Sequence, residues 1–371
     1  MNIVNIGSDK SLVGGRQLGD AIERHREYGK YVDHLDIIVY TNQRERLKPF
    51  KISENVFGYP TDSLAKIFFI FDTLRIFKKV NSEHQADIVV CQDPFIPALI
   101  GWYLKKKYGV KLQINFHGDF LDNPYWLKES WKNYFYKIIA EKTIYFADAL
   151  RVTSGRLKKK LIDRGIPAEK IYIVSTPVNL EKFKISKVPV RLTHQAITVG
   201  RVVKAKDFPT LIKAAALVKE TIPDFEWLII GDGPLLAKFK KQTSHQAYLK
   251  WLGQIAHSQL AVYYQQASLI VLTSHNESFG KVLLEGAMAQ KPAVATDTSG
   301  AQEIIEDNVS GYIVPIGDYK KLAEKIIHLV KNPELAKKMG ERAYQLVQEK
   351  FGWQKNINAI IAVWRKLAER I

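Results

Sequence analysis

Cysteine is almost absent from this 371-residue chain, which contains only Cys91. A single thiol excludes an intrachain disulfide framework and favours a reducing compartment. No apolar run approaches the roughly 18–20 residues that a membrane span needs, and residues 1–7 indicate a first strand rather than a secretory signal. We therefore expect a cytoplasmic protein. Its length and 46% hydrophobic content favour two α/β domains of ordinary size.

Acidic residues are scarce relative to basic ones, because 38 Asp and Glu accompany 55 Lys and Arg and leave a formal net charge of +17. Residues 1–100 are balanced, whereas residues 101–186 contain 17 basic and 8 acidic residues, a net charge of +9. Basic residues beside aromatic ones such as Trp131 and Phe135 suit anionic lipid headgroups, and a solvated basic helix face explains them equally well. Since no nucleic-acid recognition motif accompanies this charge, we expect no nucleic-acid partner.

Two carboxylates flank a predicted strand-to-helix turn in the second half of the chain. The apolar run 269–273 indicates a buried strand, and residues 281–289 indicate a helix that follows Gly280. Glu277 precedes the turn, and Glu285 follows it after seven intervening residues. A helix N-terminus suits a phosphate, while a carboxylate accepts hydrogen bonds from sugar hydroxyls. This combination indicates a nucleotide-sugar site.

The pattern S-x-x-E-S-F-G-K-x-x-L-E-G-A-M-A at residues 274–289 resembles the E-x7-E signature of the retaining "group 1" glycosyltransferases, family 4. Matching features extend along the whole chain. The resemblance implies a GT-B fold and a hexosyltransferase that moves a sugar from a nucleoside diphosphate sugar to an acceptor hydroxyl with retention of configuration. It also implies a role in the synthesis of cell-surface polysaccharide or glycolipid.

Strands and helices alternate along both halves of the chain, which predicts an α/β protein with two doubly wound parallel sheets. The polar segment 184–195 indicates a linker between them. By resemblance, residues 1–186 form a Rossmann-like acceptor domain and residues 187–350 a Rossmann-like donor domain that faces it across a cleft. Residues 351–371 form a terminal helix that crosses back to the first domain. We expect single helices over 319–350 and 353–371.

Basic residues follow the first predicted strand of the second domain. Arg201 and Lys206, just after Gly200, resemble the pair that this family uses on the donor pyrophosphate. Their charges suit a departing diphosphate. By the same resemblance, Glu277 holds the donor sugar and Glu285 accepts from the ribose hydroxyls. Further donor contacts are expected from Gly231, Gly253, Ile255, Ser278, Phe279 and Gly280.

Two positions of the first domain also match the family. Gly15 would let the loop after the first strand close onto the donor phosphate. His117, in an H-G pair after a predicted strand, resembles the histidine near the transferred sugar, where a neutral imidazole can bond a hydroxyl. The predicted catalytic residues are therefore His117, Glu277, Arg201 and Lys206.

No acidic or His/Cys cluster has the spacing of a metal site, and the family is metal-independent, so we expect no cofactor beyond the donor substrate. Two alternatives share the fold: a nucleotide-sugar 2-epimerase and a non-catalytic GT-B subunit. Expected partners are the donor, a saccharide or lipid-linked acceptor, and an anionic membrane surface. Residues 63–80 form an apolar helix with a basic flank, which either faces the inner membrane surface or packs into the core.

Overall fold

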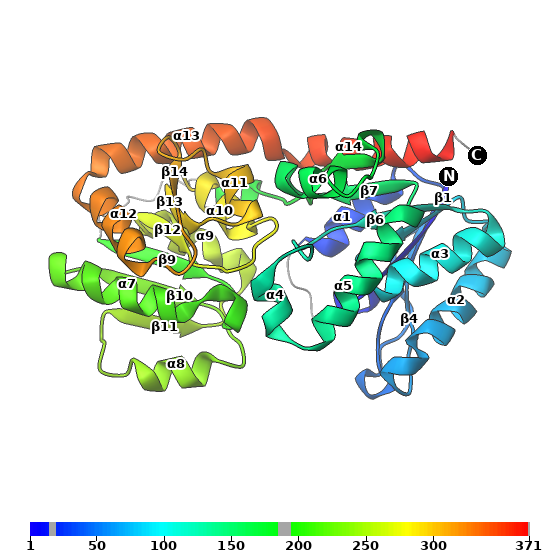
Figure 1. Ribbon diagram of the computed structural model, residues 1–371, viewed down its shortest axis with the longest axis horizontal. Coiled ribbons are helices and arrows are strands. Elements are labelled where there is room, and N and C mark those ends of the chain that lie inside the picture. Colours follow the sequence, from blue (N-terminus) through cyan, green and yellow to red (C-terminus); the bar gives the residue numbers. More distant parts are fainter. Residues whose placement is uncertain (15–19, 185–193, 370–371) are drawn as a thin grey trace. The chain divides into compact units, whose positions relative to one another are not determined.

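The computed structural model describes residues 1–14, 20–184 and 194–369, so the site residue Gly15 and most of the predicted linker fall outside it. The chain divides into two compact units. The first contains Met1–Leu121, Ser130–Val178 and Trp353–Ile371, and the second contains Asp122–Glu129 and Asn179–Gly352. Each unit is built around one mainly parallel sheet (Figure 1). In the described ranges, no helix is both long and apolar enough to cross a bilayer.

The sheet of the first unit has eight described strands in the order β3-β4-β2-β1-β5-β6-β7-β8. Their bounds are β1 (Asn2–Gly7), β2 (His34–Val39), β3 (Phe50–Ser53), β4 (Val56–Pro60), β5 (Ile88–Cys91), β6 (Lys111–Asn115), β7 (Ala149–Val152) and β8 (Ile171–Ile173). All neighbours pair in parallel except β3 with β4. The sequence analysis missed β3 and β4, because these short strands carry Lys51, Gly58 and Pro60 in place of a continuous apolar run.

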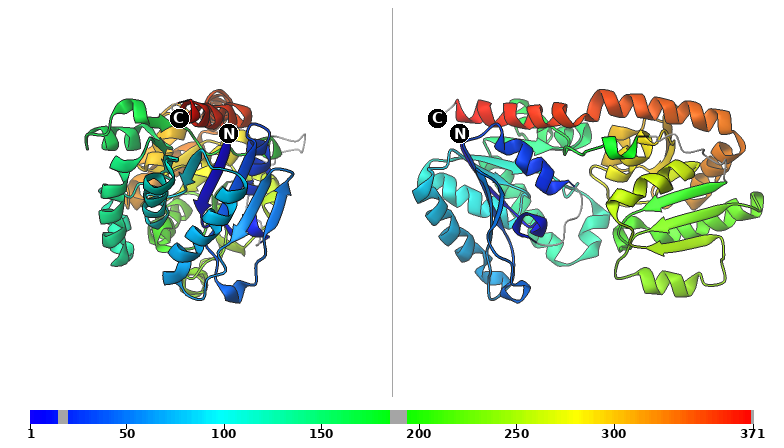
Figure 2. Two further views of the ribbon diagram at one scale, coloured as in Figure 1. Left: turned by 90° about the vertical axis from the view of Figure 1, so that its right-hand side faces the viewer. Right: turned by 180° about the vertical axis from the view of Figure 1, so that it is seen from behind.

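Helices cover both faces of this sheet. Helix α1 (Ala21–Gly29) and helix α14 (Trp353–Ala368) share one buried cluster with β1 and β2, and Figure 2 shows α14 running alongside α1. The opposite face is buried by α2 (Phe69–Glu83), α3 (Ile96–Tyr108) and α6 (Gly155–Ile162), and α5 (Lys132–Thr143) packs on α3. The terminal helix therefore belongs to the core of the first unit.

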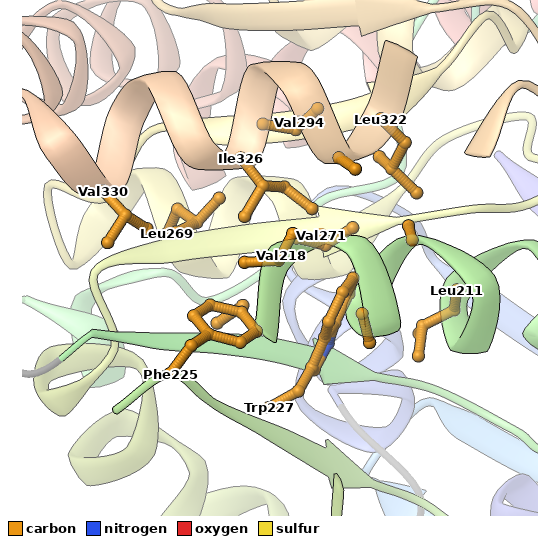
Figure 3. Packing of buried hydrophobic residues seen from close by; sticks show 14 of the residues in the cluster. Leu211, Val218, Phe225, Trp227, Leu269, Val271, Val294, Leu322, Ile326 and Val330 are labelled. Carbon is orange, nitrogen blue, oxygen red and sulfur yellow. The ribbon is translucent and has the colours of Figure 1, made fainter. Parts of the chain in front are cut away.

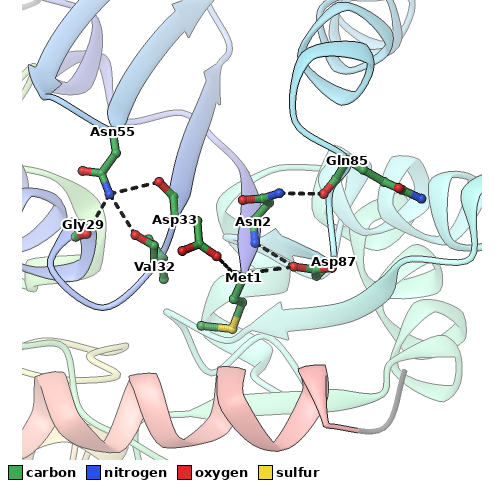
Figure 4. Close-up of polar contacts among 8 residues, drawn as sticks. All are labelled: Met1, Asn2, Gly29, Val32, Asp33, Asn55, Gln85 and Asp87. Atoms are coloured by element: carbon green, nitrogen blue, oxygen red, sulfur yellow. Dashed lines mark hydrogen bonds and ion pairs between the residues drawn. The ribbon is translucent and has the colours of Figure 1, made fainter.

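Polar contacts fix the start of β1 between its two neighbouring strands (Figure 4). The Asn2 backbone N–H donates to Asp87 Oδ2 at 2.7 Å, and the Met1 ammonium group pairs with the Asp33 carboxylate. The Asn55 side-chain amide lies 2.8 to 3.2 Å from three backbone carbonyls, those of Gly29, Val32 and Asp33. The Asn55 amide thus provides a donor to the last residue of α1 and to the loop that follows it.

The sheet of the second unit has six described strands, all parallel, in the order β11-β10-β9-β12-β13-β14. Their bounds are β9 (Gln195–Val199), β10 (Glu226–Ile230), β11 (Leu249–Gly253), β12 (Leu269–Leu272), β13 (Ala293–Thr296) and β14 (Gly311–Val314). Together with the first sheet, this confirms the predicted fold class of two doubly wound α/β units.

The second unit also has helices on both faces of its sheet. Helices α7 (Phe208–Thr221), α8 (Leu236–Gln242) and α12 (Tyr319–Lys331) bury one face. Helix α10 (Lys281–Met288) packs so closely on the other face that a Cβ at Gly286 would lie 2.3 Å from Ile270. Helices α9 (Leu260–Gln266) and α13 (Pro333–Phe351) pack against α10, and α11 (Ser299–Ile304) follows β13. Helix α4 (Pro124–Glu129) belongs to this unit although it follows β6 in the chain.

The single helix expected over 319–350 is wrong. Helix α12 ends at Lys331 and α13 begins at Pro333, with Asn332 between them. Proline lacks the backbone N–H that a continuous helix requires and is well accommodated in the first turn of a new one.

The core of the second unit centres on Trp227, whose side chain is fully buried between α7 and the sheet (Figure 3). Its indole N–H donates to Thr198 Oγ1 at 3.0 Å. The indole therefore contributes both buried apolar area and a satisfied polar group to this unit.

We predict that Trp227→Ala lowers the free energy of unfolding by about 3–5 kcal/mol, the usual cost of removing a buried aromatic ring. Trp131→Ala is the matched control, because that ring is 68% exposed, and it should change the free energy by no more than about 0.5 kcal/mol. Urea unfolding followed by circular dichroism measures both. Equal costs for the two variants would contradict the assignment of Trp227 to the core.

Candidate active site

The sequence-predicted residues Lys206 and Glu277 meet where the second sheet reverses its winding. From β9 the chain proceeds outward to β10 and β11, and β12 then returns to the other side of β9. The segments that follow β9 and β12 therefore diverge, and ligands of doubly wound sheets bind at such a point. Lys206 follows β9, Glu277 follows β12, and their side chains form an ion pair while remaining 20% and 19% exposed.

Three further contacts join the same two segments. The Thr273 hydroxyl donates to the Lys206 carbonyl at 2.7 Å, and the His275 backbone N–H donates to the Ala205 carbonyl at 2.8 Å. The His275 Nε2 atom lies 2.8 Å from Asp207 Oδ2. Burial raises the pKa of Asp207, but hydrogen bonds from His275 and Thr210 outweigh this effect, so the pKa lies below its usual range. The Lys206–Glu277 ion pair therefore joins two segments that further hydrogen bonds hold together.

Helix α4 contributes an aromatic side chain that packs against His275. The Tyr125 ring stacks on His275 with the ring centroids 4.6 Å apart and an interplanar angle of 17°. His275 and Tyr125 were not among the predicted site residues. His275 is two residues from Glu277 and could have been noticed, but nothing local in the sequence connects Tyr125 with this part of the chain.

The turn between β12 and α10 brings backbone N–H groups to the site. Gly280 takes the left-handed conformation with φ 72° and caps α10, and its N–H donates to Glu277 Oε1 at 3.2 Å. The Gly300 N–H donates to the Glu277 carbonyl at 2.7 Å. A Cβ at Gly300 would lie 2.8 Å from the backbone of Phe279, so this contact requires glycine. The predicted residues Ser278 and Phe279 are buried within the turn.

Glu285 lies deeper than Glu277, with a side chain only 4% exposed. Its Oε2 atom accepts from the Tyr264 hydroxyl at 2.8 Å, and its Oε1 atom lies 3.1 Å from His257 Nε2. Burial and the Glu285 carboxylate raise the pKa of Tyr264 well above its usual value. The sequence analysis missed His257 and Tyr264, because neither belongs to a recognisable pattern around the two glutamates.

The predicted glycines line up at the ends of neighbouring strands. The Gly200 N–H donates to the Ile230 carbonyl at 2.9 Å, and the Gly231 N–H donates to the Gly253 carbonyl at 2.8 Å. A Cβ at Gly231 would lie 1.8 Å from the Gly200 carbonyl oxygen. Arg201 is exposed beside this row, and Ile255 is half-buried beyond β11.

The Asp232 side chain accepts from its neighbouring Gly233 N–H at 2.7 Å. Helix α8 begins four residues later, at Leu236.

His117 follows β6, and it shares a pocket with residues at the winding reversal of the first sheet, where β1 lies between β2 and β5. Its Nε2 atom lies 2.7 Å from Gln92 Oε1, and the Gln92 amide donates to Asn5 Oδ1 at 2.7 Å. These side chains line a pocket of about 380 Å³ within the first unit, together with Gly7, Asp93, Phe95 and Phe120. A pocket of this size can hold a monosaccharide.

The chemistry of the second unit is that of a site for a charged, hydroxylated ligand. It presents two cationic side chains, one accessible carboxylate and the N-terminus of an eight-residue helix. In the described ranges, no group of three or more His, Cys, Asp or Glu side chains is placed to hold a metal ion.

Comparisons with known proteins agree with this geometry. The family model described as "Glycosyl transferases group 1" matches residues 184–346, and the one described as "Glycosyltransferase Family 4" matches residues 32–182. An uncharacterized glycosyltransferase of Methanocaldococcus jannaschii is 26% identical over 306 residues, which cover 82% of each chain. O-antigen chain mannosyltransferase C of Escherichia coli is 24% identical over 325 residues, again 82% of each chain.

Two solved structures show the same fold. Sucrose-phosphate synthase of Thermosynechococcus elongatus matches with a TM-score of 0.84 and 18% identity over 100% of both chains. Anabaena HepE in complex with UDP-glucose matches with a TM-score of 0.75 and 19% identity over 99% of both chains. The two Rossmann-like units thus define a GT-B protein. The chain belongs to the group 1 glycosyltransferases, as its sequence pattern indicated.

We predict that Gly300→Ala impairs the transferase although residue 300 carries no reactive group. The new Cβ forces the Phe279 backbone to shift, and a displacement of Glu277 by about 1 Å should lower turnover roughly 100-fold. Release of nucleoside diphosphate from the donor measures the effect. Gln302→Ala, at an exposed position of the same helix, should leave turnover unchanged. Normal turnover in Gly300→Ala would show that this contact does not position Glu277.

Proposed function

We propose that this chain is a retaining, metal-independent hexosyltransferase that moves a sugar from a nucleoside diphosphate sugar to an acceptor hydroxyl. The single observation that carries the proposal is the Lys206–Glu277 pair at the winding reversal of the second sheet, beside the α10 N-terminus. The pair keeps a cation and a carboxylate side by side. A diphosphate matches the cation, and a sugar hydroxyl matches the carboxylate.

Charge changes during the reaction assign a role to each residue of the second unit. As the glycosidic bond to the diphosphate breaks, negative charge grows on the leaving group, where Arg201 and Lys206 stabilise it. Glu277 accepts from the donor sugar hydroxyls, and the N–H groups of residues 278–280 bind sugar and phosphate oxygens. Glu285 accepts from the ribose hydroxyls, with Tyr264 and His257 fixing its orientation.

Retention follows if the acceptor attacks from the face that the diphosphate leaves, through an oxocarbenium-like transition state. A leaving phosphate oxygen then takes the acceptor proton, so no protein nucleophile is required. His117, oriented by Gln92, bonds a hydroxyl of the transferred sugar. HepE has been solved with UDP-glucose, and the relative from Escherichia coli is named an O-antigen chain mannosyltransferase. The HepE complex supports a nucleotide-sugar donor for this chain, and the name of the Escherichia coli relative supports a polysaccharide or glycolipid product.

A donor screen with Glu277→Gln tests the proposal. Purified protein is incubated with UDP-, GDP- and ADP-sugars in the presence of EDTA, and release of nucleoside diphosphate is measured. One donor should be consumed, and Glu277→Gln should lower its consumption roughly 100- to 1,000-fold, as expected for loss of an interaction with the reacting sugar. Glu334→Gln, an exposed change on α13, serves as the control.

The other outcomes separate the alternatives. Conversion of the donor to an isomeric nucleotide sugar without diphosphate release would indicate a 2-epimerase. Absence of turnover with every donor would indicate a non-catalytic subunit. Full activity in Glu277→Gln would remove this residue from the mechanism.

We further propose that the first unit docks on an anionic membrane surface. Trp131, which precedes α5, and Tyr134, Phe135 and Ile138 of α5 follow helical spacing and are 51–68% exposed. A second exposed set, Leu64, Ile67, Phe68 and Phe71, precedes and begins α2 with the same spacing. Within the range 63–80 expected to be helical, the buried residues are Ser63, which precedes the helices, and Thr73, Phe77 and Val80 of α2. Neighbouring lysines of the first unit such as Lys66 and Lys132 suit acidic headgroups.

Vesicle flotation tests this surface. The protein should float with vesicles of phosphatidylserine and phosphatidylcholine but not with phosphatidylcholine alone, because both apolar and charged contacts are needed. The double substitution Trp131→Ser and Phe135→Ser should reduce flotation at least tenfold. Val262→Ser with Val309→Ser, two exposed apolar positions of the second unit, should not. Flotation that is independent of lipid charge, or equal in both double variants, would contradict the proposal.

A further inference from the structure

A stripe of buried polar side chains crosses the first sheet beneath α1 and α14. Buried parallel strands normally consist of apolar residues, yet Asn5 of β1, Gln113 of β6 and Arg151 of β7 are only 4%, 1% and 6% exposed. In register, Asn5 and Gln113 both lie opposite Val90 of β5, and Arg151 lies opposite Asn115. Burying polar groups costs free energy unless each is satisfied. Because this cost reduces stability, the buried polar stripe indicates a functional role for these residues.

Hydrogen bonds satisfy most of the stripe. The Gln92 amide donates to Asn5 Oδ1 at 2.7 Å, Asn115 donates to Gln92 Oε1 at 3.2 Å, and Gln113 donates to Asn115 Oδ1 at 2.8 Å. Eight buried side-chain atoms of the described residues have no hydrogen-bond partner, and two of them lie at this stripe: Gln113 Oε1 and the indole nitrogen Nε1 of Trp364 on α14. Both residues line one small cavity of about 30 Å³, which is large enough for a single water molecule.

Two arginines border the same cavity. Arg151 donates to the Val174 carbonyl at 2.9 Å and to Thr176 Oγ1 at 3.4 Å, and Arg24 reaches the Pro177 carbonyl at 3.5 Å. In the described part of the chain neither guanidinium forms an ion pair with a carboxylate. Burial, together with the nearby charge of Arg24, lowers the pKa of Arg151 to about 10. A buried guanidinium with only neutral acceptors favours the approach of an anion.

The small cavity adjoins the saccharide-sized pocket that contains His117. Asn5, Arg24, His25, Gln92 and His117 line both of them. His25 adds no further positive charge, because burial lowers its pKa to about 4 and keeps the imidazole neutral.

Two carboxylates, Asp9 and Asp93, line the larger pocket but not the small cavity. They accept from Ser11 and from the Phe95 N–H. The positive end of the pocket is therefore the end formed by Arg24.

We propose that the acceptor is acidic, a saccharide or polyol with a carboxylate or phosphate group that Arg24 binds, with Arg151 behind it. The inference rests on the proposed function, because it treats the pocket of the first unit as the acceptor site. Phe95 and Phe120 offer apolar faces for the body of the acceptor, and hydrogen bonds with Asn5 and Asn115 keep Gln92 oriented at its polar end. A neutral acceptor should bind more weakly, because it leaves the positive charge of the Arg24 guanidinium without a negative partner.

The test measures binding of matched probes to the full-length protein by titration calorimetry. D-Glucuronate supplies a carboxylate, D-glucose 6-phosphate supplies a phosphate, and D-glucose is the neutral counterpart. At least one acidic probe should bind at least tenfold more tightly than glucose. Arg24→Gln should abolish that preference, and Arg24→Lys should restore part of it. Arg26→Gln, an exposed arginine on the same helix, should retain it.

Two results would overturn the inference: equal affinity for all three probes, or the same loss in Arg26→Gln as in Arg24→Gln. Donor consumption without acceptor, measured in parallel, keeps the two proposals apart. Normal donor consumption with no acidic preference rejects the acidic acceptor alone. Anion binding that depends on Arg24, in a protein that consumes no donor, rejects the transferase instead.

Discussion

The candidate site depends on one constraint, the reversal of strand order at β9 in the second sheet. Because β10 lies on one side of β9 and β12 on the other, the segments after β9 and β12 leave the sheet in different directions. That divergence opens the space in which Lys206 meets Glu277. The contacts of Thr273 and His275 then hold the two segments at a fixed separation. The strand order therefore determines where Lys206 and Glu277 lie, and the hydrogen bonds between the two segments hold them there.

The two glutamates of the E-x7-E pattern differ in how far their side chains are exposed. Glu277 is 19% exposed and can reach a ligand, whereas the Glu285 side chain is 4% exposed and already engages Tyr264 and His257. Glu277 therefore lies at the accessible surface of the site, and Glu285 joins α10 to α9 through Tyr264. Close approaches between backbone segments at Gly231 and Gly300 also shape the candidate site. A charged pair alone would not define the site without these contacts.

Much of this could be read from the sequence, because alternation and apolar runs are local signals. The two sheets were found in this way, whereas Arg201, Lys206, Glu277 and Glu285 were selected by their resemblance to the group 1 glycosyltransferase pattern, and their roles stay predictions. His257, Tyr264 and Tyr125 were missed, since each acquires its role through a contact with a distant part of the chain. Strands β3 and β4 were too short and too polar to stand out. The break at Pro333 did carry a local signal, which the expectation of one long amphipathic helix overlooked.

We propose that a nucleoside diphosphate binds at the strand ends of the second sheet. Hydrogen–deuterium exchange with and without UDP, GDP and ADP tests this binding most directly, because amides that bind or face the ligand exchange more slowly. We expect that one nucleotide protects the segments after β9, β10, β11 and β12, including residues 200–206 and 277–281, while β13 and β14 change little. Protection that avoids these segments for every nucleotide would contradict it.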